Sequence, residues 1–168
     1  NSMPCPSTLG YANGGIFDHL VAGWVQYWSE SLVPSEALQP NLVKALIASE
    51  SDFVPRKLAN KKNGNSARGL MQITNETRKI LGDIHGELHD HFVTVTRDDL
   101  YDPCVNICVG VRWLFYKKNL ATRRLKRDLS WLEAVFEYKG LSKASPDRAR
   151  ELMRRFNEKY ELCNQFGK

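Results

Sequence analysis

A glutamate that follows an apolar stretch is the first residue of this sequence that could do chemistry. Glu50 comes directly after Leu42-Val43-Lys44-Ala45-Leu46-Ile47-Ala48-Ser49, and helical spacing places it on or beside the buried face of that helix. Burial favours the protonated form of a carboxyl group, which a general acid needs near neutral pH. A glutamate in the last turn of a helix can instead lean out to solvent, and the spacing alone favours that alternative.

A second candidate is the run Gly69-Leu70-Met71-Gln72. Gly69 lets a backbone approach closely, and the Gln72 amide offers both a donor and an acceptor to an amide or a sugar. Taken alone, a methionine followed by a glutamine on a helix usually serves only the core.

Helices must position these residues, because strand signals are nearly absent. The spacing of apolar residues predicts helices over residues 16–33, 41–51, 67–81, 104–120, 130–138 and 146–163. Residues 82–94 are predicted to form a loop, with a short extended piece at 92–95. The 168 residues, 42% of them hydrophobic, suit one core. We therefore expect a single all-α or α-dominated domain over residues 1–168.

Charge and hydropathy exclude some functions and leave others open. The longest apolar run falls well short of the roughly 20 residues of a membrane span. Net charge is +5, and it is uneven, with −4 over residues 1–55 and +9 over residues 56–168. This imbalance favours an anionic partner, which can be nucleic acid, a membrane surface or the cell wall. The first 17 residues lack a secretory signal pattern, so we expect either a removed leader or a piece of a longer protein.

The four cysteines point to the cellular compartment and away from a metal site. Cys5 and Cys163 lie near the two ends, and Cys104 and Cys108 are four residues apart on one predicted helix. No pair has the spacing of a zinc ligand set, so we expect no metal. Two disulfides that tie the termini to the body would suit an oxidising compartment. The alternative is four buried thiols in a reduced chain, and the disulfides are slightly favoured.

Three motifs in a fixed order favour the interpretation of Glu50 as a catalytic residue. The chain reads Glu50-Ser51-Asp52-Phe53-Val54-Pro55, then Gly69 to Gln72, and then Asp102-Pro103, Asn106-Ile107, Gly110 and Trp113-Leu114. This order resembles the soluble-type lytic transglycosylases, which share a fold with goose-type lysozymes. The resemblance implies a lysozyme-like helical domain with a substrate cleft, and the motifs span about residues 40–141.

A fourth motif departs from the family. Where the family shows Ala-Tyr-Asn-Ala-Gly, the chain reads Val135-Phe136-Glu137-Tyr138-Lys139-Gly140. Aligned on Gly140 without a gap, Glu137 replaces the tyrosine, whereas one deletion puts Tyr138 in that place. One of the two is expected to face the cleft beside Glu50, and Tyr138 is favoured.

The resemblance also implies a reaction. Peptidoglycan would be cut between N-acetylmuramic acid and N-acetylglucosamine, with Glu50 as general acid and then as base, which leaves a 1,6-anhydro ring. The implied substrate-binding residues are Ser51, Met71, Gln72, Glu137 and Tyr138, where Ser51 braces the segment around Glu50, and Met71 and Gln72 line the floor of the cleft. No cofactor or metal is implied.

Two other functions stay open. A goose-type-lysozyme-like muramidase would hydrolyse the same bond with a second carboxylate, for which the candidates are Asp83, Glu87, Asp90, Asp98, Asp99 and Glu137. A basic nucleic-acid-binding helical domain, carried by residues 123–127, is the more distant alternative, and the motifs favour peptidoglycan over nucleic acid. We expect a periplasmic or secreted monomer. Its role would be that of a secreted antibacterial effector or phage-type enzyme, partnered by an immunity protein or by a secretion or phage apparatus.

Overall fold

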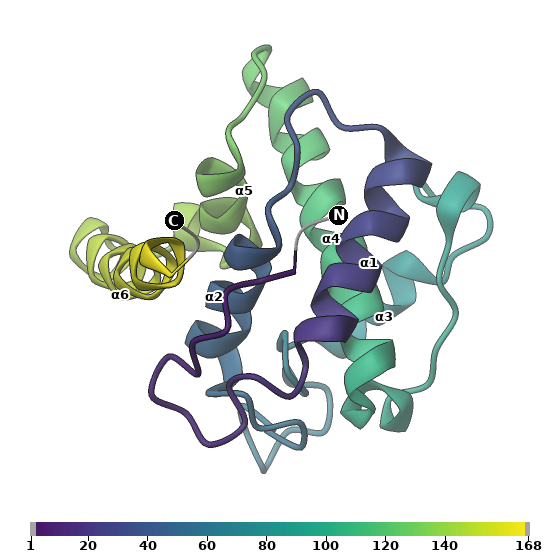
Figure 1. The fold of residues 1–168 in the computed structure, drawn as a ribbon. Helices are drawn as coiled ribbons and strands as arrows, with labels where there is room; N and C mark the ends of the chain where they lie inside the picture. The colour runs from purple at the N-terminus through teal and green to yellow at the C-terminus, as the bar shows by residue number, and fades with distance from the viewer. Residues whose placement is uncertain (1–2, 167–168) are drawn as a thin grey trace.

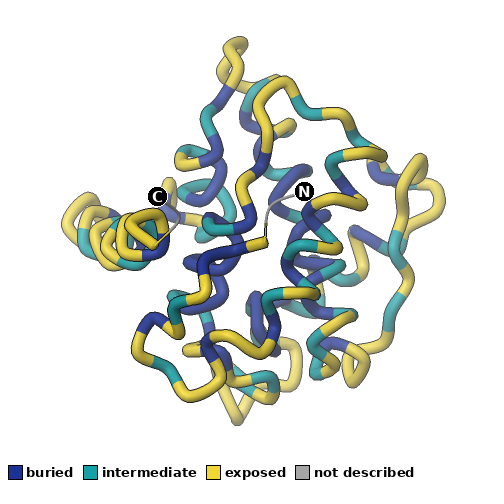
Figure 2. Tube along the Cα trace, viewed as in Figure 1, coloured by how far each residue is buried: buried dark blue, intermediate teal, exposed yellow. Residues whose placement is uncertain are grey.

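An almost completely apolar helix runs through the centre of the molecule. This helix, α2 (Pro40–Ser51), begins with a proline, whose fixed φ suits the first helical position. Residues 42–48 are all buried, so most of α2 lies inside the fold (Figure 2). The helix packs mainly against α6 (Pro146–Gln165) and α1 (Asp18–Leu32). A buried central helix gives the residues in its last turn a fixed position.

The other helices surround α2 (Figure 1). The computed structural model describes residues 3–166, and within them the chain forms six α-helices, three short 3₁₀ helices and isolated β-bridges. The elements not yet named are α3 (Asn75–Leu81), η1 (His89–His91), η2 (Asp98–Tyr101), α4 (Pro103–Leu125), α5 (Trp131–Tyr138) and η3 (Leu141–Lys143). This architecture confirms the predicted α-dominated fold.

The longest of these helices is α4, which begins at Pro103. Asp102 caps it, since its carboxylate accepts hydrogen bonds from the backbone N–H groups of Cys104 and Val105 at 2.8 and 3.2 Å. The helix packs against α1 on one side and α5 on the other. No helix among the described residues combines the length and the apolar character that crossing a membrane requires.

One predicted helix is wrong in its first half. Residues 67–81 were expected to be helical, but α3 begins only at Asn75. Arg68 instead forms antiparallel bridges with Leu58 and Ile73. Gly69 and Gln72 have φ values of 79° and 54°, which a right-handed helix does not allow. The extended piece expected at residues 92–95 forms no β-bridge with any residue in the range 3–166.

The two ends of the chain are joined by one disulfide, Cys5–Cys163. The predicted pair of disulfides, which would tie the termini to the body of the domain, is wrong: the bridge joins the two termini to each other, and Cys104 and Cys108 are free. Residues four apart on a helix have Cβ atoms about 5–6 Å apart, which exceeds the reach of a disulfide. Burial also raises the pKa of Cys108 to about 11, so its thiolate is scarce and its reactivity low.

Candidate active site

Glu50 lies in the last turn of α2, where the chain leaves the helix abruptly. Asp52 and Phe53 follow with φ values of 53° and 60°, and Asp52 caps the helix through a hydrogen bond from its N–H to the Ala48 carbonyl. Phe53 is buried and packs near the ring of Tyr11. These features anchor the segment that follows Glu50. The side chain of Glu50 itself remains 19% exposed. The carboxylate is therefore half-buried and reachable from solvent.

Lys139 forms an ion pair with Glu50, a contact that the sequence analysis missed. Its Nζ lies 2.9 Å from Glu50 Oε1 and donates a second hydrogen bond to Ser49 Oγ, also at 2.9 Å. Its side chain is only 9% exposed. A lysine just after a helix normally faces solvent. The one sequence feature that could have pointed to Lys139 is its place in the motif that departs from the family.

Tyr138 is the tyrosine beside Glu50. Its hydroxyl donates to the Met71 carbonyl at 2.6 Å, which joins the end of α5 to the turn at residues 69–72. Burial raises the pKa of Tyr138 well above its ordinary value, and the neighbouring charge of Glu50 raises it further. The hydroxyl thus keeps its proton and remains a donor over the whole neutral range.

Glu137 lies on another face of α5 and pairs with Arg124. The Arg124 guanidinium is 2.8 Å from Glu137 Oε1, and the Glu137 side chain is 11% exposed. Adjacent residues on a helix point about 100° apart. The Glu137 carboxylate is directed to Arg124 of α4, whereas Tyr138 and the C-cap residue Lys139 are directed to the turn at residues 69–72 and to Glu50. The alignment that would place Glu137 at the site is therefore corrected in favour of the one that places Tyr138 there.

Asn106 holds the turn at residues 69–72 against α4. Its Oδ1 accepts from the Met71 N–H at 2.7 Å, and its Nδ2 donates to the carbonyls of Arg68 and Leu100 at 3.1 and 2.8 Å. Gly69 permits this approach, because a Cβ there would lie 2.1 Å from Asn106 Nδ2. One buried amide thus fixes the backbone that accepts the Tyr138 hydrogen bond.

Met71 and Ser51 do not reach a substrate directly, contrary to expectation. Met71 is completely buried, and a Cβ at Gly110 would lie 2.3 Å from its Sδ. Ser51 is also fully buried and donates to the Ile47 carbonyl at 3.1 Å. Both residues support the site from beneath. Gln72 is half-buried, and its Nε2 donates to the carbonyls of Lys57 and Gly69.

Comparisons with known proteins bear on the family and the fold of this chain. The sequence profile of the Transglycosylase SLT domain matches residues 30–160, which is most of the chain. The chain belongs to the transglycosylase SLT family. The match covers α2, the turn at residues 69–72, α4 and α5, and thus every element that contributes to the site of this SLT domain. No curated protein matches it at a significant level.

A solved structure supports the fold of the SLT domain. The 70 kDa soluble lytic transglycosylase from Escherichia coli superimposes with a TM-score of 0.51 at 18% sequence identity. The superposition covers 90% of this chain and 24% of that protein, so the SLT domain spans about a quarter of the longer enzyme. At this identity the likeness speaks for the helical fold alone.

Of the other acidic candidates of the SLT domain, all but Asp98 contact residues other than Glu50 and Lys139. Glu87 accepts from the Tyr116 hydroxyl at 2.8 Å. Asp99 accepts from the Thr96 N–H at 2.8 Å, and the hydrogen bonds from Thr96 lower the pKa of that carboxyl. Asp83 accepts from the backbone of His85, Asp90 pairs with His89, and Asp98 is exposed.

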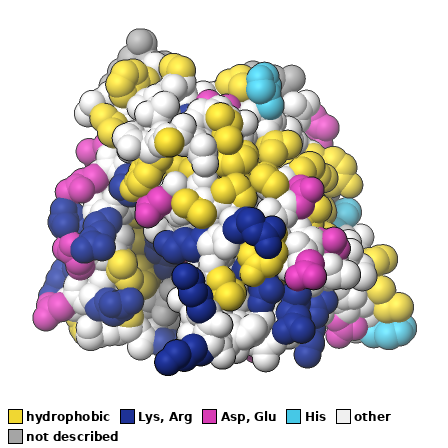
Figure 3. Space-filling model, turned by 90° about the horizontal axis from the view of Figure 1, so that it is seen from below, with side chains coloured by type: hydrophobic (Ala, Val, Ile, Leu, Met, Phe, Trp, Pro, Cys, Tyr) yellow, Lys and Arg dark blue, Asp and Glu magenta, His cyan; other side chains and the backbone are white. Residues whose placement is uncertain are grey.

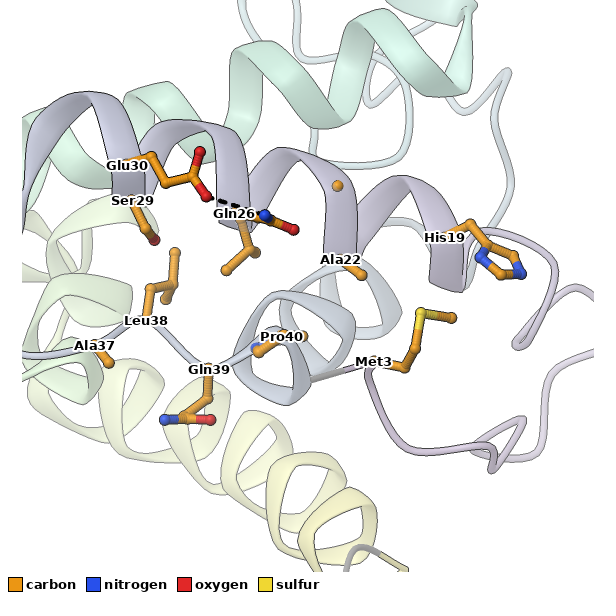
Figure 4. Close-up of a pocket in the computed structure, with 12 residues that line it drawn as sticks. Met3, His19, Ala22, Gln26, Ser29, Glu30, Ala37, Leu38, Gln39 and Pro40 are labelled. Carbon is orange, nitrogen blue, oxygen red and sulfur yellow. Dashed lines mark hydrogen bonds between the residues drawn. The ribbon is translucent and has the colours of Figure 1, made fainter. Parts of the chain in front are cut away.

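A pocket of about 500 Å³ in the SLT domain lies away from Glu50. It is formed by α1 and the segment before α2 (Figure 4). Gln26 and Glu30 of α1 are joined there by a hydrogen bond of 3.0 Å. Neither Glu50 nor Tyr138 lines this pocket, so it is separate from the candidate active site.

Proposed function

We propose that this domain cleaves the glycan strand of peptidoglycan between N-acetylmuramic acid and N-acetylglucosamine, with Glu50 as the general acid and base. The observation that carries the proposal is the half-buried Glu50 carboxylate, held by Lys139 and close to Tyr138 at the end of a buried helix. Membership of the SLT family supports the reaction class.

In the first step, protonated Glu50 donates its proton to the glycosidic oxygen. The bond between that oxygen and C1 of N-acetylmuramic acid breaks, and the leaving sugar takes the proton as a hydroxyl. Positive charge develops at C1, where the acetamido oxygen of the substrate can stabilise it. Glu50 is then a carboxylate and can act as a base.

In the second step, the Glu50 carboxylate takes the proton of the 6-hydroxyl, and O6 bonds to C1. The product is a 1,6-anhydro ring, and Glu50 is protonated again. No enzyme nucleophile and no external water are consumed. Because O6 of the same sugar captures C1, this path requires that bulk water be kept from the cationic intermediate.

The surroundings of Glu50 favour a transglycosylase over a hydrolase. An inverting hydrolase needs a second carboxylate roughly 6.5–9.5 Å from the acid to activate water. Glu137 is bound to Arg124, and Glu87 and Asp99 are engaged in contacts of their own. Each of these three carboxylates has a partner of its own, and none of those contacts includes Glu50 or Lys139.

The surface charge supports a polymer with anionic groups as the substrate. The loop after α2 lies at the bottom of Figure 1, and Lys and Arg side chains gather on the face seen from below in Figure 3. Arg56, Lys61 and Lys62 of that loop are exposed and form no ion pair with an acid among residues 3–166. The carboxylates of the stem peptides provide matching negative charge.

Nucleic acid is less well supported as a partner. In the basic run at residues 123–127, Arg123, Arg124 and Arg127 pair with Glu87, Glu137 and Glu133. Arginine side chains that are already paired with glutamates contribute little to the binding of DNA phosphates. Salt-sensitive binding to duplex DNA without wall degradation would favour this alternative.

The mass of the reaction products tests the proposal. Purified peptidoglycan is digested, and the fragments are analysed by mass spectrometry. Anhydro-muropeptides are one water lighter than the reducing ends that a hydrolase makes, and we expect them as the main product. If only reducing ends are found, the protein is a muramidase, and if no fragment is released the proposed function fails.

We also propose that the protein acts in the periplasm or outside the cell, as a secreted antibacterial effector or a phage-type enzyme. The Cys5–Cys163 disulfide suits such an oxidising compartment. Expression with a periplasmic leader in a Gram-negative host should lyse the cells, whereas expression in the cytoplasm should not. Equal growth with and without the leader would contradict the proposal.

A further inference from the structure

The ammonium group of Lys139 is fixed inside the site from both ends of its side chain. At the tip, Nζ binds Glu50 Oε1 and Ser49 Oγ, and Ser49 Oγ in turn donates to the Leu46 carbonyl at 2.9 Å. At the backbone, the Lys139 N–H donates to the Val135 carbonyl at 3.0 Å and caps α5. A lysine held in this way has few alternative positions.

The ion pair with Lys139 affects the balance between the charged and the protonated form of Glu50. A cation close to a carboxylate favours its charged form, whereas removal from water favours the neutral form. The other titratable side chains near this end of α5 do not oppose the lysine. Tyr138 stays neutral because burial raises its pKa, and Glu137 is paired with Arg124. On α2 and in the segment after it, Ser49 carries no charge and Asp52 is exposed.

We propose that Lys139 is a positioning residue for the general acid. It holds Glu50 by Oε1, leaves Oε2 for the glycosidic oxygen, and stabilises the charged form of the half-buried carboxylate. The inference rests on the proposed role of Glu50. In the second step the same ammonium stabilises the carboxylate that takes the proton of the 6-hydroxyl.

The pH dependence of cleavage tests this role. Rates on a peptidoglycan suspension are measured across the pH range for wild type, Lys139→Met and Lys139→Arg. In Lys139→Met, which keeps the aliphatic stem but loses the charge, the alkaline limb should move upward by about one to two pH units. Lys139→Arg should retain the wild-type limb. Lys143→Met is the matched control, since Lys143 is exposed on η3. An unchanged limb in Lys139→Met overturns the inference.

A titration that does not depend on activity covers the case of an inactive variant. The carboxyl carbon signal of Glu50, assigned by its loss in Glu50→Gln, is followed by NMR against pH in wild type and Lys139→Met. The midpoint should rise in the variant by the same one to two units, roughly, and an equal midpoint overturns the inference. Should Glu50→Gln remain active, the proposed function fails, while this titration still decides whether Lys139 controls the proton of Glu50.

Discussion

Glu50 has two neighbours, Tyr138 and Lys139, which both come from the C-terminal end of α5. Tyr138 and Lys139 are consecutive residues, yet one binds the turn at residues 69–72 and the other binds the last turn of α2. The end of α5 therefore connects the turn at residues 69–72 to the last turn of α2, where Glu50 lies. Removing either side chain should affect the site without disturbing the distant core.

The hydroxyl of Tyr138 gives the first prediction. Tyr138→Phe leaves the Met71 carbonyl without its donor, which should lower the free energy of unfolding by about 1–3 kcal/mol and reduce the cleavage rate. Denaturant unfolding and wall clearing measure the two effects. Tyr27→Phe, at an exposed tyrosine, is the control and should change neither. A Tyr138→Phe variant as stable and as active as wild type would contradict this account of the tyrosine.

The turn at residues 69–72 and helix α4 form one unit at the level of elements. Asn106 and Gly110 are four residues apart, so they share a face of α4. Asn106 binds the backbone of the turn, and Gly110 makes room for Met71. This contact is the physical reason why an asparagine and a glycine stand four residues apart in the third motif.

Gly69 provides a direct test of that unit. Gly69→Ala adds a Cβ at a positive φ and against Asn106 and the Leu100 carbonyl, which should destabilise the fold by about 2–5 kcal/mol. Gly23→Ala is the matched control, because nothing lies within 4 Å of its Cβ position in α1. That change should stabilise the protein by about 0.5–1 kcal/mol. Similar unfolding midpoints for the two variants would argue against a tightly fitted turn.

A buried ion pair joins α1 to α2 and gives a third prediction. Lys44 is fully buried and lies 2.9 Å from Asp18, whose pKa is raised by burial and lowered in part by Lys44. Asp18→Asn leaves Lys44 without its counter-ion and should cost about 3–5 kcal/mol in the free energy of unfolding. Glu158→Gln, which removes an exposed pair with Arg154, should cost at most about 1 kcal/mol. Equal losses in chemical denaturation would show that burial of the pair has no consequence.

Elements with unbroken apolar spacing were predictable, and those defined by distant contacts were not. The spacing predicts α1, α2 and α6 to within a few residues, because α1 and α6 each bury one continuous face and α2 is apolar over a continuous stretch that is buried on all sides. Residues 67–74 look helical by the same test, but the amide of Asn106 and the positive φ of Gly69 hold them in a turn. A hydrogen bond across 35 residues leaves no local periodic signal.

The candidate site shows the same limit. Glu50 and the turn were found through motifs, and Tyr138 could be separated from Glu137 only once the rotation of α5 was known. Lys139 was missed because a charged residue after a helix usually faces solvent. Here the last turn of α2 supplies two acceptors for its ammonium group, which no feature of residues near Lys139 in the chain indicates.

At the scale of the whole molecule, the Cys5–Cys163 disulfide closes a loop of almost the entire chain. The sequence separation is 158 residues, and a cross-link over such a distance restricts the unfolded state strongly. Cys5→Ser with Cys163→Ser should lower the free energy of unfolding by about 2–5 kcal/mol. Cys104→Ser, at an exposed free thiol, should change it by no more than about 0.5 kcal/mol.

Denaturant unfolding with and without reductant measures the contribution of the disulfide. Reductant should bring the wild type to the stability of the double variant and leave the double variant itself unchanged. If the double variant is as stable as the oxidised wild type, the disulfide does not stabilise the fold.

The rate of glycan cleavage by Glu50→Gln tests the central claim most directly. Glutamine keeps the size of the side chain but cannot donate or accept the proton, so the release of anhydro-muropeptides should fall by at least about a hundredfold, while the helical circular dichroism spectrum stays unchanged. A folded Glu50→Gln protein that cleaves peptidoglycan at the wild-type rate would contradict the account.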